Sequence, residues 1–147
     1  MKPRNCWVIL ERKAHDEVRD LQQQIALVQG KSDQLQQTLD RLMGMYAEYQ
    51  AREHTQQKQW GLQNSMNQRQ FMAQLLQLRE RIQHDLMHQQ GLAAQLRARL
   101  IKAESERMKM QALVDQQEQA ERKLQATLEQ KQMDELGVRR YNMQSLL

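Results

Sequence analysis

The residues whose types and spacing come nearest to a chemical site are His84 and His88, which lie four apart and would share one face of a helix. A zinc-protease helix has glutamate after its first histidine, whereas Asp85 stands here, and no third ligand is evident. Cys6 is the only cysteine, so an internal disulfide and a thiolate cluster are excluded, and no histidine lies near it as a base. We expect no metal and no cofactor.

Other catalytic constellations are also missing from the sequence. Carboxylate pairs such as Asp134 and Glu135 fall on an expected exposed helix, with nothing to desolvate them. There is no glycine-rich phosphate loop, and no Ser/His/Asp set has a scaffold on which to converge. The sequence therefore predicts a protein that is not an enzyme and has no small-molecule substrate.

The elements that would position any site are predicted to be helices. Glutamine occupies 28 of 147 positions, and Ala, Glu, Lys, Leu, Arg and Gln together occupy 93. Such a share of helix formers is typical of a coiled coil or long helix. One proline and 4% aromatic residues leave material for a narrow apolar seam rather than a globular core. The predicted fold class is all-α.

The net charge of +4 raises the question of a nucleic-acid partner. Positive and negative side chains alternate along most of the chain, which is typical of a solvated helix face and unlike a basic arm. We expect no nucleic acid to bind, although one mildly basic stretch keeps that class open, namely Arg69, Arg79, Arg81, Arg97 and Arg99. The longest apolar run is Cys6 to Leu10, too short for a signal peptide or a membrane span, so we expect a cytoplasmic protein.

The first half of the chain carries a regular apolar pattern. Its steps alternate between four and three, which is the repeat of a coiled-coil seam. The seam runs through Gly30 and Gly44 without a change of phase, so we expect one helix over about 6–60. The seam residues, of which only Ser32 is polar, are Ala14, Val18, Leu21, Ile25, Val28, Ser32, Leu35, Leu39, Leu42, Tyr46 and Tyr49.

The pattern stops near Trp60, and signals for the end and start of a helix follow. Gly61 suits the left-handed residue that ends a helix. Ser65 and Gln68 fit a capping box at the start of the next helix. We therefore expect chain 1–147 to be a single long antiparallel two-helix coiled-coil hairpin with its tip near 61–65.

The second helix is expected over about 65–136, with Gly137 ending it before a short C-terminal tail. Its seam begins at Phe71, Leu75, Leu78 and Ile82, and the next apolar residue, Leu86, implies a stutter. The seam resumes as Ala93, Leu96, Leu100 and Ala103 and weakens as Arg107, Met110, Val114, Gln117, Glu121, Leu124 and Leu128. Folding back at residue 63 would leave about the last 25 residues without a partner in the same chain.

Three stretches together resemble the FliJ family of bacterial flagellar export proteins. They are Tyr46-x-x-Tyr49, then Asn67-Gln68-Arg69-Gln70-Phe71 leading into Leu75, and Glu129-Gln130-Lys131-Gln132-Met133-Asp134-Glu135 near the end. The last of them is the most specific, and the resemblance covers most of the chain. It implies a hairpin similar to the central shaft of rotary ATPases.

The resemblance also implies partners. Proteins of this family insert in the hexameric ring of the flagellar export ATPase, contact the cytoplasmic domain of the membrane export gate and assist turnover of export chaperones. The chain is then expected to take part in motility and chemotaxis, in the cytoplasm and peripherally at the inner membrane of the flagellar base. The overhang should contact the ring, and its basic residues are candidates for that contact: Arg122, Lys123, Lys131, Arg139 and Arg140.

The resemblance assigns export-gate binding to a face that begins at Phe71 and Leu75 and continues to Leu78 and Ile82. At the last two positions the family leads us to expect a small and a polar residue, so this chain departs from the pattern. Periodicity alone favours a seam for all four residues. The neighbouring Met72 and Leu76 widen the apolar band, so we expect Phe71 and Leu75 to face a partner and their truncation to cost little stability.

Two further interpretations stay open on the sequence alone. The chain could be the equivalent stalk of a virulence type III secretion injectisome. It could instead be a dimeric architectural coiled coil, in which the first-helix heptads of two chains pair and residues 61–65 are helical.

Overall fold

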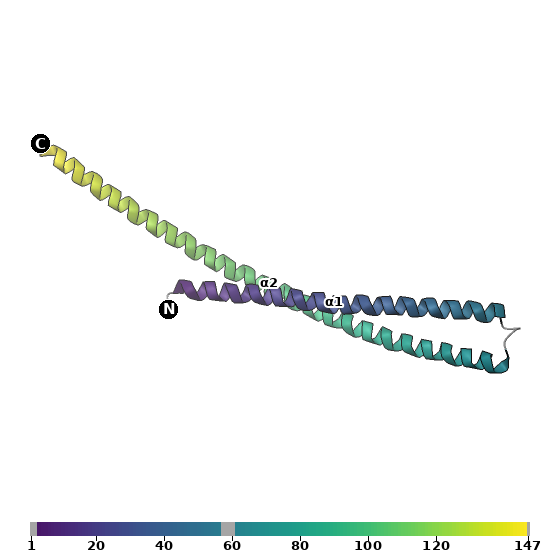
Figure 1. Cartoon of the computed structure of the whole chain (residues 1–147). Helices are drawn as coiled ribbons and strands as arrows, with labels where there is room; N and C mark the ends of the chain where they lie inside the picture. Colours follow the sequence, from purple (N-terminus) through teal and green to yellow (C-terminus); the bar gives the residue numbers. More distant parts are fainter. Residues whose placement is uncertain (1–2, 57–60, 147) are drawn as a thin grey trace. The chain divides into compact units, whose positions relative to one another are not determined.

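A computed structural model describes residues 3–56 and 61–146 of the chain. Two helices account for nearly all of them, α1 (Pro3–Gln56) and α2 (Leu62–Ser145), and the described residues contain no strand (Figure 1). The two helices pack against each other as a helical hairpin, which confirms the predicted fold class. In this structure α2 covers the seam of α1, as expected for the hairpin rather than for pairing between the seams of two chains.

The packing divides into two units. The first joins α1 up to Val18 with α2 from Lys102 on, and the second is the stretch Arg19–Ile101. The second unit holds a core of Leu42, Leu75 and Ile82, with Leu35, Leu39, Tyr46 and Tyr49 packed against it. No described side chain is less than 2% exposed, as expected when two helices share only one line of contact.

The predicted seam of α1 is confirmed along its whole length. Every position from Ala14 to Tyr49 in that seam is buried or half-buried. The same alternation of four and three extends to half-buried Trp7 and Glu11 at one end and to Glu53 at the other. Gly30 and Gly44 lie on the exposed side of α1, so neither interrupts the packing.

The seam of α2 keeps the same period but differs from the prediction at its start. One line of buried or half-buried residues follows steps that alternate between four and three: Gln68, Met72, Leu75, Arg79, Ile82, Leu86, Gln89, Ala93, Leu96, Leu100, Ala103, Arg107, Met110, Val114 and Gln117. Six further half-buried residues flank this line, namely Ser65, Leu76, Leu92, Glu104, Gln111 and Leu113. The predicted stutter at Leu86 is therefore wrong. It followed from assigning Phe71 and Leu78 to the seam, whereas Met72 and Arg79 occupy those positions.

The predicted turn signals also need correction. Gly61 does not have the left-handed conformation expected of it, because no described residue has a positive φ. Its carbonyl oxygen instead accepts the hydrogen bond from the Ser65 backbone N–H, at 3.2 Å, so Gly61 precedes the first turn of α2. Ser65 lies inside that turn, and the Gln68 side chain reaches α1 rather than a free N–H of its own helix. The capping box is therefore wrong. The predicted end of the first helix, residue 60, lies outside the described residues.

The far end of α2 runs beyond its predicted limit. Gly137 lies within the helix, which continues to Ser145, so the short C-terminal tail is wrong. One glycine costs about 1 kcal/mol in a helix, which a long cooperative helix can absorb. Local bonds support it, such as that from Gln130 Nε2 to Asp134 Oδ1 at 3.3 Å. Residues 118–146 are exposed throughout, and we call them the free segment.

Candidate interaction site

Near its tip a side-chain hydrogen bond joins the two helices. The Gln68 side chain donates from Nε2 to the backbone carbonyl oxygen of Tyr49, at 3.0 Å. Gln68 is only 7% exposed, because it occupies a seam position of α2. This bond fixes the last turns of α1 against the first turns of α2.

The same two turns are joined by an aromatic contact. The rings of Tyr49 and Phe71 meet edge to face, with centroids 5.0 Å apart and planes at 65°. Such pairs contribute about 0.5–1.5 kcal/mol beyond the area they bury. The Arg52 guanidinium lies 5.7 Å from the centroid of the Tyr49 ring. The Tyr49 ring is thus held by Arg52 and by Phe71.

Gln68 also carries an unsatisfied group. Its Oε1 atom is buried and has no hydrogen-bond partner. An unpaired buried acceptor costs about 1–3 kcal/mol, which is comparable to or larger than the gain from the bond that Nε2 makes. An apolar residue at this seam position would avoid that cost, so stability alone does not explain the glutamine.

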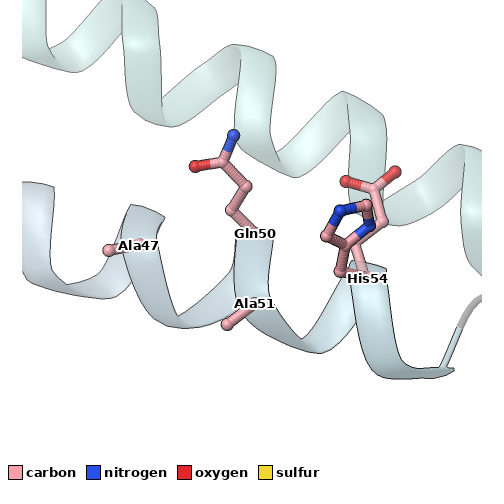
Figure 2. Close-up of a pocket in the computed structure, with 5 residues that line it drawn as sticks. Ala47, Gln50, Ala51 and His54 are labelled. Carbon is pink, nitrogen blue, oxygen red and sulfur yellow. The ribbon is translucent and has the colours of Figure 1, made fainter.

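Two open grooves lie near this contact. One is lined by Tyr49, Phe71 and the amides Asn64, Asn67 and Gln68. The other lies on α1 beside Ala47, Gln50, Ala51, Glu53 and His54, and Figure 2 shows the Gln50 side chain directed from α1 toward α2. Glu53, which lines the second groove, forms a long ion pair of 3.9 Å with Arg69, whose side chain is mostly in solvent. Such an exposed pair contributes little stability.

The structure separates the four residues predicted to bind the export gate. Phe71 is 36% exposed and Leu78 is 42% exposed, whereas Leu75 and Ile82 are each 7% exposed and belong to the core. The expectation that Leu75 faces outward is therefore wrong, because its heptad position points it at Leu42 and its neighbours. Phe71 and Leu78 lie seven residues apart, on one face beside the seam. Their role in gate binding stays a prediction.

The sequence did not predict the groove lined by Tyr49, Phe71 and the three amides, because this lining depends on which turn of α1 packs against α2. The midpoint between the contacting residues Tyr49 and Phe71 is residue 60, three positions before the fold-back predicted at residue 63. With the register set three residues earlier, Tyr49 would have been placed against Phe71. Of the residues assigned to the tip, Gln68 is the one that joins the two helices.

The free segment presents a second candidate surface. All five basic residues predicted to contact the ATPase ring are exposed, as are the segment's large apolar residues. The basic residues are Arg122, Lys123, Lys131, Arg139 and Arg140, and the apolar ones are Leu124, Leu128, Met133, Leu136, Val138, Tyr141, Met143 and Leu146. No other part of the described chain covers this apolar set.

The histidines and carboxylates form no metal site within the described residues, since no group of three or more potential ligands comes together there. Both His84 and His88 are exposed. No helix in the described part of the chain combines the length and apolar character needed to cross a membrane.

A comparison with models of protein families assigns nearly the whole chain to one family. The family model described as "Flagellar FliJ protein" matches residues 9–145. The chain belongs to the FliJ family. The family model spans both helices and the free segment, so the resemblance noted in the sequence is confirmed. Comparisons with curated proteins and with solved structures found no match.

Membership of the FliJ family makes this chain a component related to flagellar protein export. The family is a non-catalytic part of that apparatus. The match is to a flagellar family, which favours flagellar export over the injectisome alternative.

Proposed function

We propose that this FliJ-family chain is a non-catalytic shaft and adaptor of the flagellar export ATPase. In this role one end of the chain inserts in the hexameric ATPase ring, and the region near the hairpin tip contacts the cytoplasmic domain of the export gate. The chain also assists the turnover of export chaperones. It works in the cytoplasm, associated peripherally with the inner membrane at the flagellar base, without a cofactor, a small-molecule substrate or nucleic acid.

The observation that supports the shaft role best is the free segment. The helix α2 continues through the free segment to Ser145, and no residue of the segment is buried although it carries eight large apolar side chains. A helix that exposes this much apolar surface is typical of one whose partner is another protein. The segment carries five basic and five acidic residues, and in this proposal its basic side chains meet acidic positions of the ring.

The gate contact is supported by Phe71 and Leu78. Both are exposed on one face of α2, while the seam beside them is filled by Met72, Leu75 and Arg79. An aromatic anchor outside the seam is available to a partner without opening the hairpin. Partly exposed aromatic side chains are frequent binding anchors once a partner buries them.

The shaft role is tested by deleting residues 120–147 and measuring ATP hydrolysis by the export ATPase. We expect a helical hairpin that melts cooperatively but no longer stimulates hydrolysis. The double variant Leu124→Gln, Leu128→Gln tests the same surface with the helix at full length. Leu27→Gln is its matched control, because Leu27 is 68% exposed on α1 outside the free segment. Unchanged stimulation by both the deletion and the double variant would refute the shaft role.

A further inference from the structure

Gln68 and Phe71 of α2 both contact Tyr49 of α1, and these two contacts join the helices near the tip. The Gln68 amide donates to the Tyr49 carbonyl oxygen at 3.0 Å, and the ring of the same tyrosine meets the Phe71 ring at 5.0 Å. Phe71 lies three residues after Gln68, about one turn along α2. Tyr49 is therefore the residue that both contacts share.

The position of Gln68 makes it unusual among these three. It is nine-tenths buried in an otherwise mainly apolar line of contact, and its Oε1 atom has no hydrogen-bond partner. An apolar side chain of the same size would fill the same space without an unpaired acceptor. What only the glutamine supplies is the N–H that binds the Tyr49 carbonyl.

We propose that Gln68 is a positioning residue for the export-gate contact. By holding the Tyr49 backbone, it fixes the Tyr49 ring as a support against which Phe71 is presented at one orientation. Pre-ordering an aromatic anchor reduces the conformational entropy that binding would otherwise cost. Gln68 itself does not touch the gate in this scheme. The inference rests on the gate contact proposed above.

A second role for a buried polar residue is to set the register of a coiled coil without acting on any binding surface. The two roles predict different behaviour of the Phe71 ring. If Gln68 only sets the register, a variant that stays folded in the same register should leave the ring where it is. If Gln68 positions the anchor, the ring should move although the hairpin stays intact.

The sequence offers a clean probe of that ring, because Phe71 is the only phenylalanine in the chain. Uniform incorporation of 4-fluorophenylalanine thus gives a single fluorine resonance in the full-length protein. The variant Tyr49→Leu serves as a reference, because its fluorine chemical shift is that of a Phe71 ring without the Tyr49 ring beside it. We expect Gln68→Met to shift the signal toward that position while its melting temperature is no lower than that of the wild type. Gln70→Met is the matched control, because Gln70 is exposed on the same turn.

Binding to the purified cytoplasmic domain of the export gate completes the test. We expect Gln68→Met to weaken binding about five- to tenfold and Phe71→Ala by roughly 30-fold, the loss typical of an anchor residue. Gln70→Met should bind like the wild type. Wild-type affinity in Gln68→Met, or an unshifted fluorine signal in that variant, would overturn the positioning role. A wild-type protein that does not bind the gate domain would instead refute the proposed gate contact, and the fluorine signal would still show whether Gln68 orders Phe71.

Discussion

Leu75→Ala should destabilise the protein markedly more than Phe71→Ala, which reverses what ring size alone would suggest. Leu75 is 7% exposed and packs in the core with Leu42 and Ile82. Truncating Leu75 to alanine removes apolar groups that are almost fully buried and leaves a cavity, which usually lowers the free energy of unfolding by about 2–5 kcal/mol. Neighbours in a two-helix rod can relax into the space, so we expect the lower half of that range, about 2–3 kcal/mol. Phe71 is 36% exposed and its loss opens onto solvent, so about 1–2 kcal/mol follows from its remaining burial and its ring contact.

Thermal melting followed by circular dichroism measures this difference. In a chain of this size each kcal/mol corresponds to about 3 °C, so Leu75→Ala should lower the melting temperature by about 6–9 °C and Phe71→Ala by about 3–6 °C. Leu27→Ala is the control, since Leu27 is 68% exposed on α1 and should change the stability by no more than about 0.5 kcal/mol. Equal melting temperatures for Leu75→Ala and Leu27→Ala would refute the seam assigned to α2.

Three further predictions concern a glycine, a buried arginine and the charges of the free segment. A Cβ added at Gly91 would have nothing within 4 Å, so Gly91→Ala should raise the melting temperature by about 3 °C, and a lower value would mean that the glycine is needed. The Nε atom of Arg79 is buried at a seam position without a hydrogen-bond partner, so Arg79→Met should have a higher melting temperature than the wild type. Arg81→Met is the control, because Arg81 is exposed and its replacement should not raise the melting temperature. A lower melting temperature for Arg79→Met would show that the arginine stabilises the hairpin. Stimulation of the ATPase at low protein concentration should decline as salt rises from about 0.05 to 0.3 M if the basic residues of the free segment steer association, and a salt-independent rate would exclude steering.

The sequence was sufficient to predict the path of α1 but not the start of the α2 seam. In α1 nearly every seam position is apolar, so the alternation of four and three can be followed by hydrophobicity alone. In α2 the seam includes Gln68, Arg79 and Gln89, while apolar Phe71 and Leu78 lie beside it. A seam assigned by following apolar residues alone is therefore shifted by one residue at Phe71, and it needs a stutter to regain the observed positions.

The contacts near the tip depend on tertiary register, which local signals do not contain. Ser65 and Gln68 have the types and spacing of a capping box, yet α2 begins three residues before Ser65. Gln68 is thereby carried into the seam, where the carbonyl of Tyr49 is within reach. Gly137 illustrates the same limit at the other end, because a glycine that would terminate a short helix is tolerated within an 84-residue one.

The phase of the α2 seam connects the fold with the proposed function. If Phe71 and Leu78 filled the seam, a partner could reach them only by separating the helices. The heptad instead places Met72 and Arg79 at those positions and leaves the chain's only phenylalanine on the flank, supported by Tyr49. The polar seam residues lower the stability of the hairpin, and in return Phe71 remains outside the seam. A shift of one residue in the seam thus decides which side chains hold the hairpin together and which are exposed beside it.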